Sequence, residues 1–316
     1  MRNSSKVILL SGLSIAFILL FLFWDLGSSF DYVLPRRFTK VAAIVLTAGC
    51  IAFSTVIFQT ITNNRILTPS LIGLDSLYML IQTAIVFFFG GKELALMDSG
   101  VHFVISVGLM VVFAVLLFKL VFRIEGRNIY FLLLIGIIFG TFFSSISSFL
   151  QLLIDPNEFT LVQDSMFASF NNVNEDLLVL SFLLVLLVSL WAKKLLKYLN
   201  VMSLGKDQAV NLGVPFDRIA QQWLIIIAIL VSVATALVGP ITFLGLLVAN
   251  LAHELFRTYK HSYLIGGAIL LSIVTLVGGQ LIVERLFEFS IPISVIINLA
   301  GGIYFLYLLL KENRSW

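Results

Sequence analysis

The chain has 316 residues, of which 60% are hydrophobic and only 12% charged, and its mean hydropathy is +1.08. Soluble domains carry roughly 25% charged residues, so this composition excludes an ordinary soluble protein and favours one that lies mostly in a bilayer. The net charge of +3 needs no nucleic acid to explain it, because a basic excess in a membrane protein commonly reflects topology.

Long apolar runs bounded by charged residues, glycine, proline or asparagine predict ten membrane-spanning helices. In chain order they are residues 7–24, 41–61, 71–89, 101–122, 130–154, 177–191, 223–238, 241–256, 263–283 and 293–310. The seventh and eighth are separated at Gly239 and Pro240, because one helix over 223–256 would overshoot the bilayer. All six prolines fall in or beside the predicted connections. We therefore predict an all-α polytopic membrane protein with a single transmembrane domain over 1–316.

Charge is distributed unevenly between the two sides that this segmentation defines. The side that carries both termini holds 15 of the 20 basic residues, whereas the other side holds 11 of the 17 acidic residues. Since basic residues accumulate in cytoplasmic loops, both termini are predicted to be cytoplasmic.

The longest inner connection, residues 192–222, contains a distinct short motif. We predict a helix over 206–212 that ends at Gly213 as a left-handed cap and is followed by Pro215. A helix this short is marginal alone, so it is expected to lie on the membrane surface or to dock into a partner. The alternative is a solvated basic loop.

Ionisable residues are scarce inside the predicted spans. Asp75 and Glu254 are expected near the cytoplasmic ends of the third and eighth spans, and His102 near the outer end of the fourth, as interfacial groups. No catalytic constellation, metal-binding cluster or phosphate-binding loop is recognisable, and the single cysteine, Cys50, has no partner. We expect no enzyme activity and no cofactor, and any ATP hydrolysis that drives transport must belong to another chain.

Uncharged polar residues and glycines are the main polar content of the spans. Gly136 and Gly140 have the spacing that lets membrane helices pack closely. Most of the polar residues are expected to serve packing, and the alternative is a path for a large hydrogen-bonding solute, for which Ser54, Gln59 and Gln151 are the candidates.

Four stretches together carry a family resemblance: 34–37 with the glycines and polar residues that follow it, 203–215, 239–248, and 266–285 with the last helix. They resemble the FecCD-type permease subunits of bacterial ATP-binding-cassette importers for iron siderophores, haem and cobalamin, over nearly the whole chain. The chain departs from the family at Ala249-Asn250, where Pro-His is common.

Three further stretches, 59–70, 155–158 and 167–172, look most like permeases for catecholate siderophores, petrobactin among them. The resemblance implies a multi-pass protein of the bacterial cytoplasmic membrane that imports a ferric siderophore. Its implied partners are a second homologous permease subunit, identical or not, two ATPase subunits and an external substrate-binding lipoprotein. A haem or cobalamin importer is the alternative within the family.

The resemblance also implies roles for particular residues. Coupling to the ATPase would fall to Gly205, Lys206, Asp207, Ala209, Leu212 and Gly213. Docking of the binding protein would fall to Arg36, Arg37 and Arg285, which could otherwise anchor to lipid headgroups. Two alternatives belong to other functional classes. A secondary transporter would need carboxylates embedded in the membrane or broken helices. A scaffold without transport activity would not need the segment that couples to the ATPase.

Overall fold

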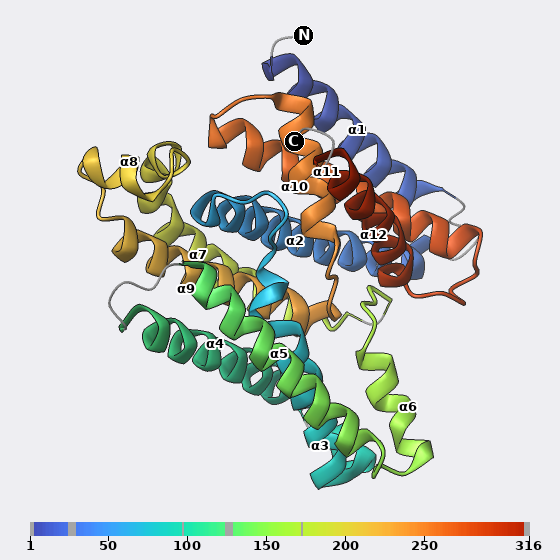
Figure 1. Cartoon of the computed structure of the whole chain (residues 1–316). Helices are drawn as coiled ribbons and strands as arrows, with labels where there is room; N and C mark the ends of the chain where they lie inside the picture. The colour runs from blue at the N-terminus through green and yellow to red at the C-terminus, as the bar shows by residue number, and fades with distance from the viewer. Residues whose placement is uncertain (1–2, 25–29, 97, 124–128, 172, 313–316) are drawn as a thin grey trace.

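The computed structural model describes residues 3–24, 30–96, 98–123, 129–171 and 173–312, and within them the chain is helical, with no strand (Figure 1). The elements are α1 (Asn3–Phe23), α2 (Phe30–Thr62), the 3-10 helix η1 (Pro69–Ile72), α3 (Leu74–Leu96), α4 (Ser99–Arg123), α5 (Ile129–Gln151), α6 (Pro156–Ser165), α7 (Glu175–Met202), α8 (Lys206–Asn211), α9 (Phe216–Val238), α10 (Leu244–Phe256), α11 (His261–Arg285) and α12 (Ile293–Glu312).

Ten of these helices correspond to the ten predicted spans. Seven are long and apolar enough to cross a membrane, namely α1, α2, α4, α5, α7, α9 and α11. The other three, α3, α10 and α12, contain shorter apolar segments. The break between the seventh and eighth spans is confirmed, because α9 ends at Val238 and α10 begins at Leu244. The all-α polytopic class is therefore confirmed.

The bundle is built around α2 and α9. In their apolar windows 67% and 72% of the residues are buried, against 17% in each of α1 and α7. Trp223 of α9 is fully buried and its ring lies 6.1 Å from that of Phe53 of α2. The outer helices expose long apolar side chains, as expected for surfaces solvated by lipid tails.

The two ends of the bundle are distinguished by α8 and α6, which lie at opposite sides of the molecule (Figure 1). At the α8 end, Lys6 of α1 donates to the Leu255 carbonyl at 2.6 Å, and the Tyr304 hydroxyl of α12 donates to Glu254 at 3.5 Å. The first residue of α11 contacts Asn200, shortly before α8. Both described ends of the chain therefore lie at the α8 end.

Two elements differ from the sequence-based expectation. Helix α2 begins eleven residues before the predicted span and contains Pro35, so the prediction that this proline lies in or beside a connection is wrong. The charged residues of these first turns hid the helix from a search for apolar runs. Helix α6 was missed because it is polar, and it is started by Pro156 and by Asp155, whose side chain accepts the Asn157 N–H at 2.8 Å.

Candidate functional site

A cavity of about 300 Å³ lies between α3, α5 and the break that separates α9 from α10. Its lining residues are Asp75, Ser76, Met79, Ser144, Ser147, Ser148, Gln151, Met166, Pro240 and Thr242. Most of these residues carry a hydroxyl, amide or carboxyl group, although apolar atoms make up the larger part of the surface that faces the cavity. We refer to it below as the Asp75 cavity.

The cavity lies at mid-depth because the chain re-enters the membrane after α2. Residues 63–73 turn back from the α8 end, and Gly73, with a φ of 87°, joins η1 to α3. A Cβ on Gly73 would lie 3.0 Å from the Gly136 carbonyl oxygen and from Gly140 Cα. These glycines are seven and eleven residues into α5, about 10 and 16 Å along its axis, which is near the middle of a core about 30 Å thick.

The expected close packing at Gly136 and Gly140 is present, but the partner is the backbone of the re-entrant segment. A Cβ on Gly136 would lie 2.8 Å from Ile72 Cα and 2.9 Å from the Leu71 carbonyl oxygen. Because no side chain intervenes, η1 rests directly on α5. This contact places the first turn of α3 inside the bundle.

Asp75 lies in that first turn, so the expectation that it sits near the cytoplasmic end of its span is wrong. The prediction assumed that α3 crosses the membrane from one surface, whereas α3 starts at mid-depth. The side chains of Ser70 and Thr242 hydrogen-bond to the carboxyl group, and Oδ2 is buried with no hydrogen-bond partner. The carboxyl group lies beside the N-terminal end of α3.

Gln151 is the one predicted path residue that lines the Asp75 cavity. Its Nε2 donates to Thr83 Oγ1 at 3.2 Å and to Ser147 Oγ at 3.0 Å, and the Thr83 and Ser147 hydroxyls are 2.8 Å apart. Ser144 Oγ donates to Ser76 Oγ at 3.1 Å. These bonds tie the polar face of α5 to α3.

A polar stripe on α5 continues this face onto the surface of the chain. Thr141, Ser144, Ser145 and Ser148 are exposed and recur at helical spacing on a membrane-spanning helix. The hydroxyls of Thr141 and Ser145 donate to carbonyls of the preceding turn, and Ser144 donates to Ser76, so these groups are satisfied within the chain. A stripe of small hydroxyl side chains is also suited to pack against another membrane helix. The sequence analysis did not single out this stripe, although its spacing of three and four residues could have revealed it.

Ser54 and Gln59 lie apart from this stripe, in the interior of α2. Ser54 is 0% exposed and Gln59 is 3% exposed. Gln59 Nε2 donates to the Arg65 carbonyl at 2.6 Å, and Asn250 Nδ2 donates to the same carbonyl at 2.9 Å. Both amides therefore hold the start of the re-entrant segment, and the three predicted path residues do not share one surface.

The predicted short helix is present as α8. Gly205 precedes it with a φ of 96°, and Gly213 follows it with a φ of 82°, which is the left-handed cap expected from the sequence. Ala209 is fully buried against the bundle, whereas Leu212 is 64% exposed. Lys206 Nζ lies 2.8 Å from Asp217 Oδ1.

The outer face of α8 combines polar and apolar groups. Asp207 is exposed in its first turn, and Leu204 and Val210, 54% and 50% exposed, flank it together with Leu212. Exposed leucines that flank a short helix outside the apolar spans are typical of a surface that another protein covers.

The three arginines at the opposite end have different environments. Arg37 Nη1 donates to the carbonyls of Phe21, Leu22 and Trp24 at 3.0, 3.3 and 2.7 Å, and Arg285 Nη2 donates to the Trp24 carbonyl at 3.0 Å. Both therefore cap the end of α1.

Arg36 is exposed, and its guanidinium carbon lies 4.2 Å from the centre of the Tyr32 ring. Of the three arginines, it is the one whose charged group is directed at a ring on its own helix rather than at the α1 carbonyls. Nearby, Lys40 and Glu284 form an ion pair at 3.1 Å, with side chains 17% and 10% exposed. This pair joins α2 to α11 beneath the arginines.

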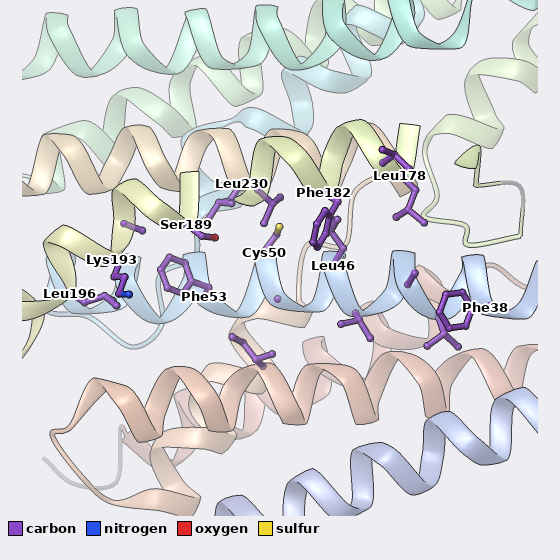
Figure 2. Close-up of a pocket in the computed structure, with 18 residues that line it drawn as sticks. Phe38, Leu46, Cys50, Phe53, Leu178, Phe182, Ser189, Lys193, Leu196 and Leu230 are labelled. Carbon is purple, nitrogen blue, oxygen red and sulfur yellow. The ribbon is translucent and has the colours of Figure 1, made fainter. Parts of the chain in front are cut away.

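A larger groove, of about 930 Å³, runs between α2 and α7 (Figure 2). Phe38 lies near one end and Lys193 near the other, with Cys50 and Phe182 between them (Figure 2). Its walls are almost entirely apolar and α7 is the outer neighbour, so it opens toward lipid. A hydrogen-bonding solute would find few partners there, and we assign it no part in transport.

Comparison with known proteins gives consistent matches over the whole chain. The model of the FecCD transport family matches residues 4–311. The petrobactin import system permease protein YclO of Bacillus subtilis (strain 168) is 64% identical over 316 residues, which is 100% of both chains. The petrobactin import system permease protein FatC of Bacillus anthracis is 38% identical over 287 residues, covering 90% of this chain and 80% of the relative.

Among solved structures, a metal-chelate type ABC transporter in an inward-facing conformation superposes with a TM-score of 0.84. It is 23% identical, and the match covers 98% of this chain and 100% of that one. At this identity the similarity supports the fold.

Proposed function

The chain belongs to the FecCD transport family, and from this premise we propose that it is the membrane-spanning permease subunit of an ATP-driven importer of ferric siderophores, with petrobactin as its cargo. The assignment of petrobactin as the cargo rests on the 64% identity, over the full length of both chains, to a relative named as a petrobactin import permease. The transmembrane domain over residues 1–316 is then a single permease unit with both termini in the cytoplasm.

The polar stripe of α5 supports a path between two permease subunits. A second, homologous subunit facing the stripe would pack closely on these small side chains and enclose their hydroxyls in a polar channel. Ser144, Ser148 and Gln151 would then line the path, with the Asp75 cavity as a side pocket at mid-depth. Ser54 and Gln59 would support the helices behind it.

The α8 segment supports coupling to one of two cytoplasmic ATPase subunits. Leu204, Val210 and Leu212 present an exposed apolar surface, while buried Ala209 fixes α8 on the bundle. Closure of the ATPase pair would move α8 and, through α7 and α9, tilt the helices as rigid bodies. Gly205 and Gly213 permit the backbone turns that hold the helix across the end of the bundle.

Arg36 supports docking of the external binding protein, because its charge is exposed at the α6 end. Arg37 and Arg285 would contribute mainly by holding α1 against α2 and α11. We therefore propose Arg36 as the docking residue that can be changed without disturbing the fold. Docking should weaken with added salt, since exposed charges are screened.

A second candidate, a secondary transporter, is favoured by one observation: Asp75 and two helix breaks meet at mid-depth, as in ion-coupled carriers. Such a carrier would not need α8 as an ATPase contact. Haem or cobalamin would be the alternative cargo within the family.

The proposal is tested by uptake of labelled ferric petrobactin, a ferric hydroxamate, haem and cobalamin in a strain that lacks only this gene. We expect loss of petrobactin uptake alone, restored by the gene on a plasmid. Unchanged petrobactin uptake in a strain without another petrobactin importer would refute the proposal. Loss of haem or cobalamin uptake alone would show that this compound, and not petrobactin, is the cargo.

A further inference from the structure

Two interrupted helices meet at the Asp75 cavity. Helix α3 starts there after η1, and the segment between α9 and α10 contributes Pro240 and Thr242 to the opposite wall. Broken helices at mid-depth are a common way for transport proteins to bind a charged group, because free helix ends and loose backbone supply polar contacts away from water. The cavity is therefore a candidate binding site in its own right.

The cavity has one acidic residue and no basic one. Asp75 contributes a carboxyl group, and none of the residues that line the cavity is basic. Ser70 and Thr242 supply neutral hydrogen bonds, but Oδ2 is buried and has no partner. A buried carboxylate without a cation is costly, and the dipole of α3 offsets only part of that cost. A cationic group that bound at the Asp75 carboxyl would offset this cost.

The geometry favours an organic cation over a metal ion. Within the described residues there is no group of three or more His, Cys, Asp or Glu side chains placed to bind a metal. The cavity, at about 300 Å³, is also far larger than one ion needs, and serine hydroxyls and the Gln151 amide line it. Neutral acceptors around one carboxylate complement an ammonium group on a flexible arm.

We propose that the Asp75 cavity receives a protonated amine of the siderophore, with Asp75 as its counter-ion and the cavity hydroxyls as further acceptors. The inference rests on the proposed function and adds a chemical basis for cargo selection. A ferric catecholate centre is anionic and would be repelled by Asp75. Only a cationic arm would enter the cavity, which would orient the chelate in the path.

The test uses two cargoes that differ only in this group: a ferric catecholate chelate whose ligand bears a free secondary amine, and its N-acetylated, uncharged analogue. Uptake of each is measured in the deletion strain carrying wild-type protein, Asp75→Asn or Asp164→Asn. The last variant is a matched control, since Asp164 is exposed on α6 and lies outside the cavity. Membrane abundance is measured for all of them.

Asp75→Asn should reduce uptake of the amine chelate by about tenfold or more, while uptake of the acetylated analogue changes less than about twofold. Asp164→Asn should change neither. An equal loss for both cargoes at normal abundance would mean that Asp75 only positions α3, and no loss for either would mean that the carboxylate is not used. Either result would overturn the proposal.

A second pair of variants covers the case in which Asp75→Asn does not accumulate. Ser148 is exposed and lines the cavity, so Ser148→Lys would place a cation beside Asp75, and Ser148→Gln is a neutral control of similar length. Only the lysine variant should discriminate against the amine chelate; equal behaviour of the two would contradict the proposal. Failure of the proposed function is distinct, because wild-type protein would then restore uptake of neither chelate.

Discussion

Replacement of Gly136 by alanine tests the contact that places the first turn of α3 at mid-depth. The new Cβ would lie 2.8 Å from Ile72 Cα and 2.9 Å from the Leu71 carbonyl oxygen. Carbon atoms prefer separations of about 3.5–4.0 Å, so the overlap with Ile72 is about 0.7–1.2 Å. Both neighbours are backbone atoms and cannot swing away. The re-entrant segment would have to shift by a similar distance.

The expected cost follows from two opposing effects. Overpacking of this kind costs about 1–3 kcal/mol, while alanine in a helix interior gains about 1 kcal/mol over glycine. Gly108→Ala on α4 isolates the second effect, because a Cβ there meets nothing within 4 Å. We therefore expect Gly136→Ala to be less stable than Gly108→Ala by about 1–3 kcal/mol.

The assay is unfolding of the purified protein in detergent, followed by thermal denaturation and by titration with a denaturing detergent. Gly108→Ala should equal or exceed the wild type, and Gly136→Ala should fall below it. Uptake of the siderophore should also fall for Gly136→Ala, since Asp75 moves with η1. Equal stability of the two variants would show that η1 is not fixed by close backbone contact with α5.

Three further sets of variants test the capping of α1, the ion pair and the coupling surface. Arg37→Met should lower the stability by about 1–3 kcal/mol through loss of the α1 cap, whereas Arg36→Met should leave the melting temperature unchanged. Equal effects of the two substitutions would refute the assignment of Arg37, and not Arg36, as the residue that caps α1. Lys40→Met should cost about 3 kcal/mol because Glu284 stays buried without its cation, and adding Glu284→Gln should recover part of it in thermal denaturation. Leu212→Arg should abolish uptake and stimulation of the ATPase without changing the melting temperature, and normal uptake would exclude this face from coupling.

The sequence predicts helix ends well where an apolar run stops at a glycine or a proline. The break at Gly239 and the helix over 206–212 were both predicted, and α8 ends one residue earlier than expected. Glycine and proline act locally, so their effect on helix ends can be read without knowledge of distant contacts.

The depth of α3 could not be read in this way. A hydropathy pattern does not reveal whether a helix begins at the membrane surface or after a re-entrant segment, and the contact between Gly73 and Gly140 joins residues far apart in the chain. For this reason Asp75 was placed at the wrong depth. The capping role of Arg37 was equally hidden, because it depends on three carbonyls of another helix.

The most direct test of the account is transport by the reconstituted complex of this chain with its second permease subunit, ATPases and binding protein in liposomes. We predict uptake of labelled ferric petrobactin that requires ATP on the side of α8 and persists when ion gradients are collapsed. Uptake that proceeds without ATP and stops when a proton or sodium gradient is removed would contradict the account.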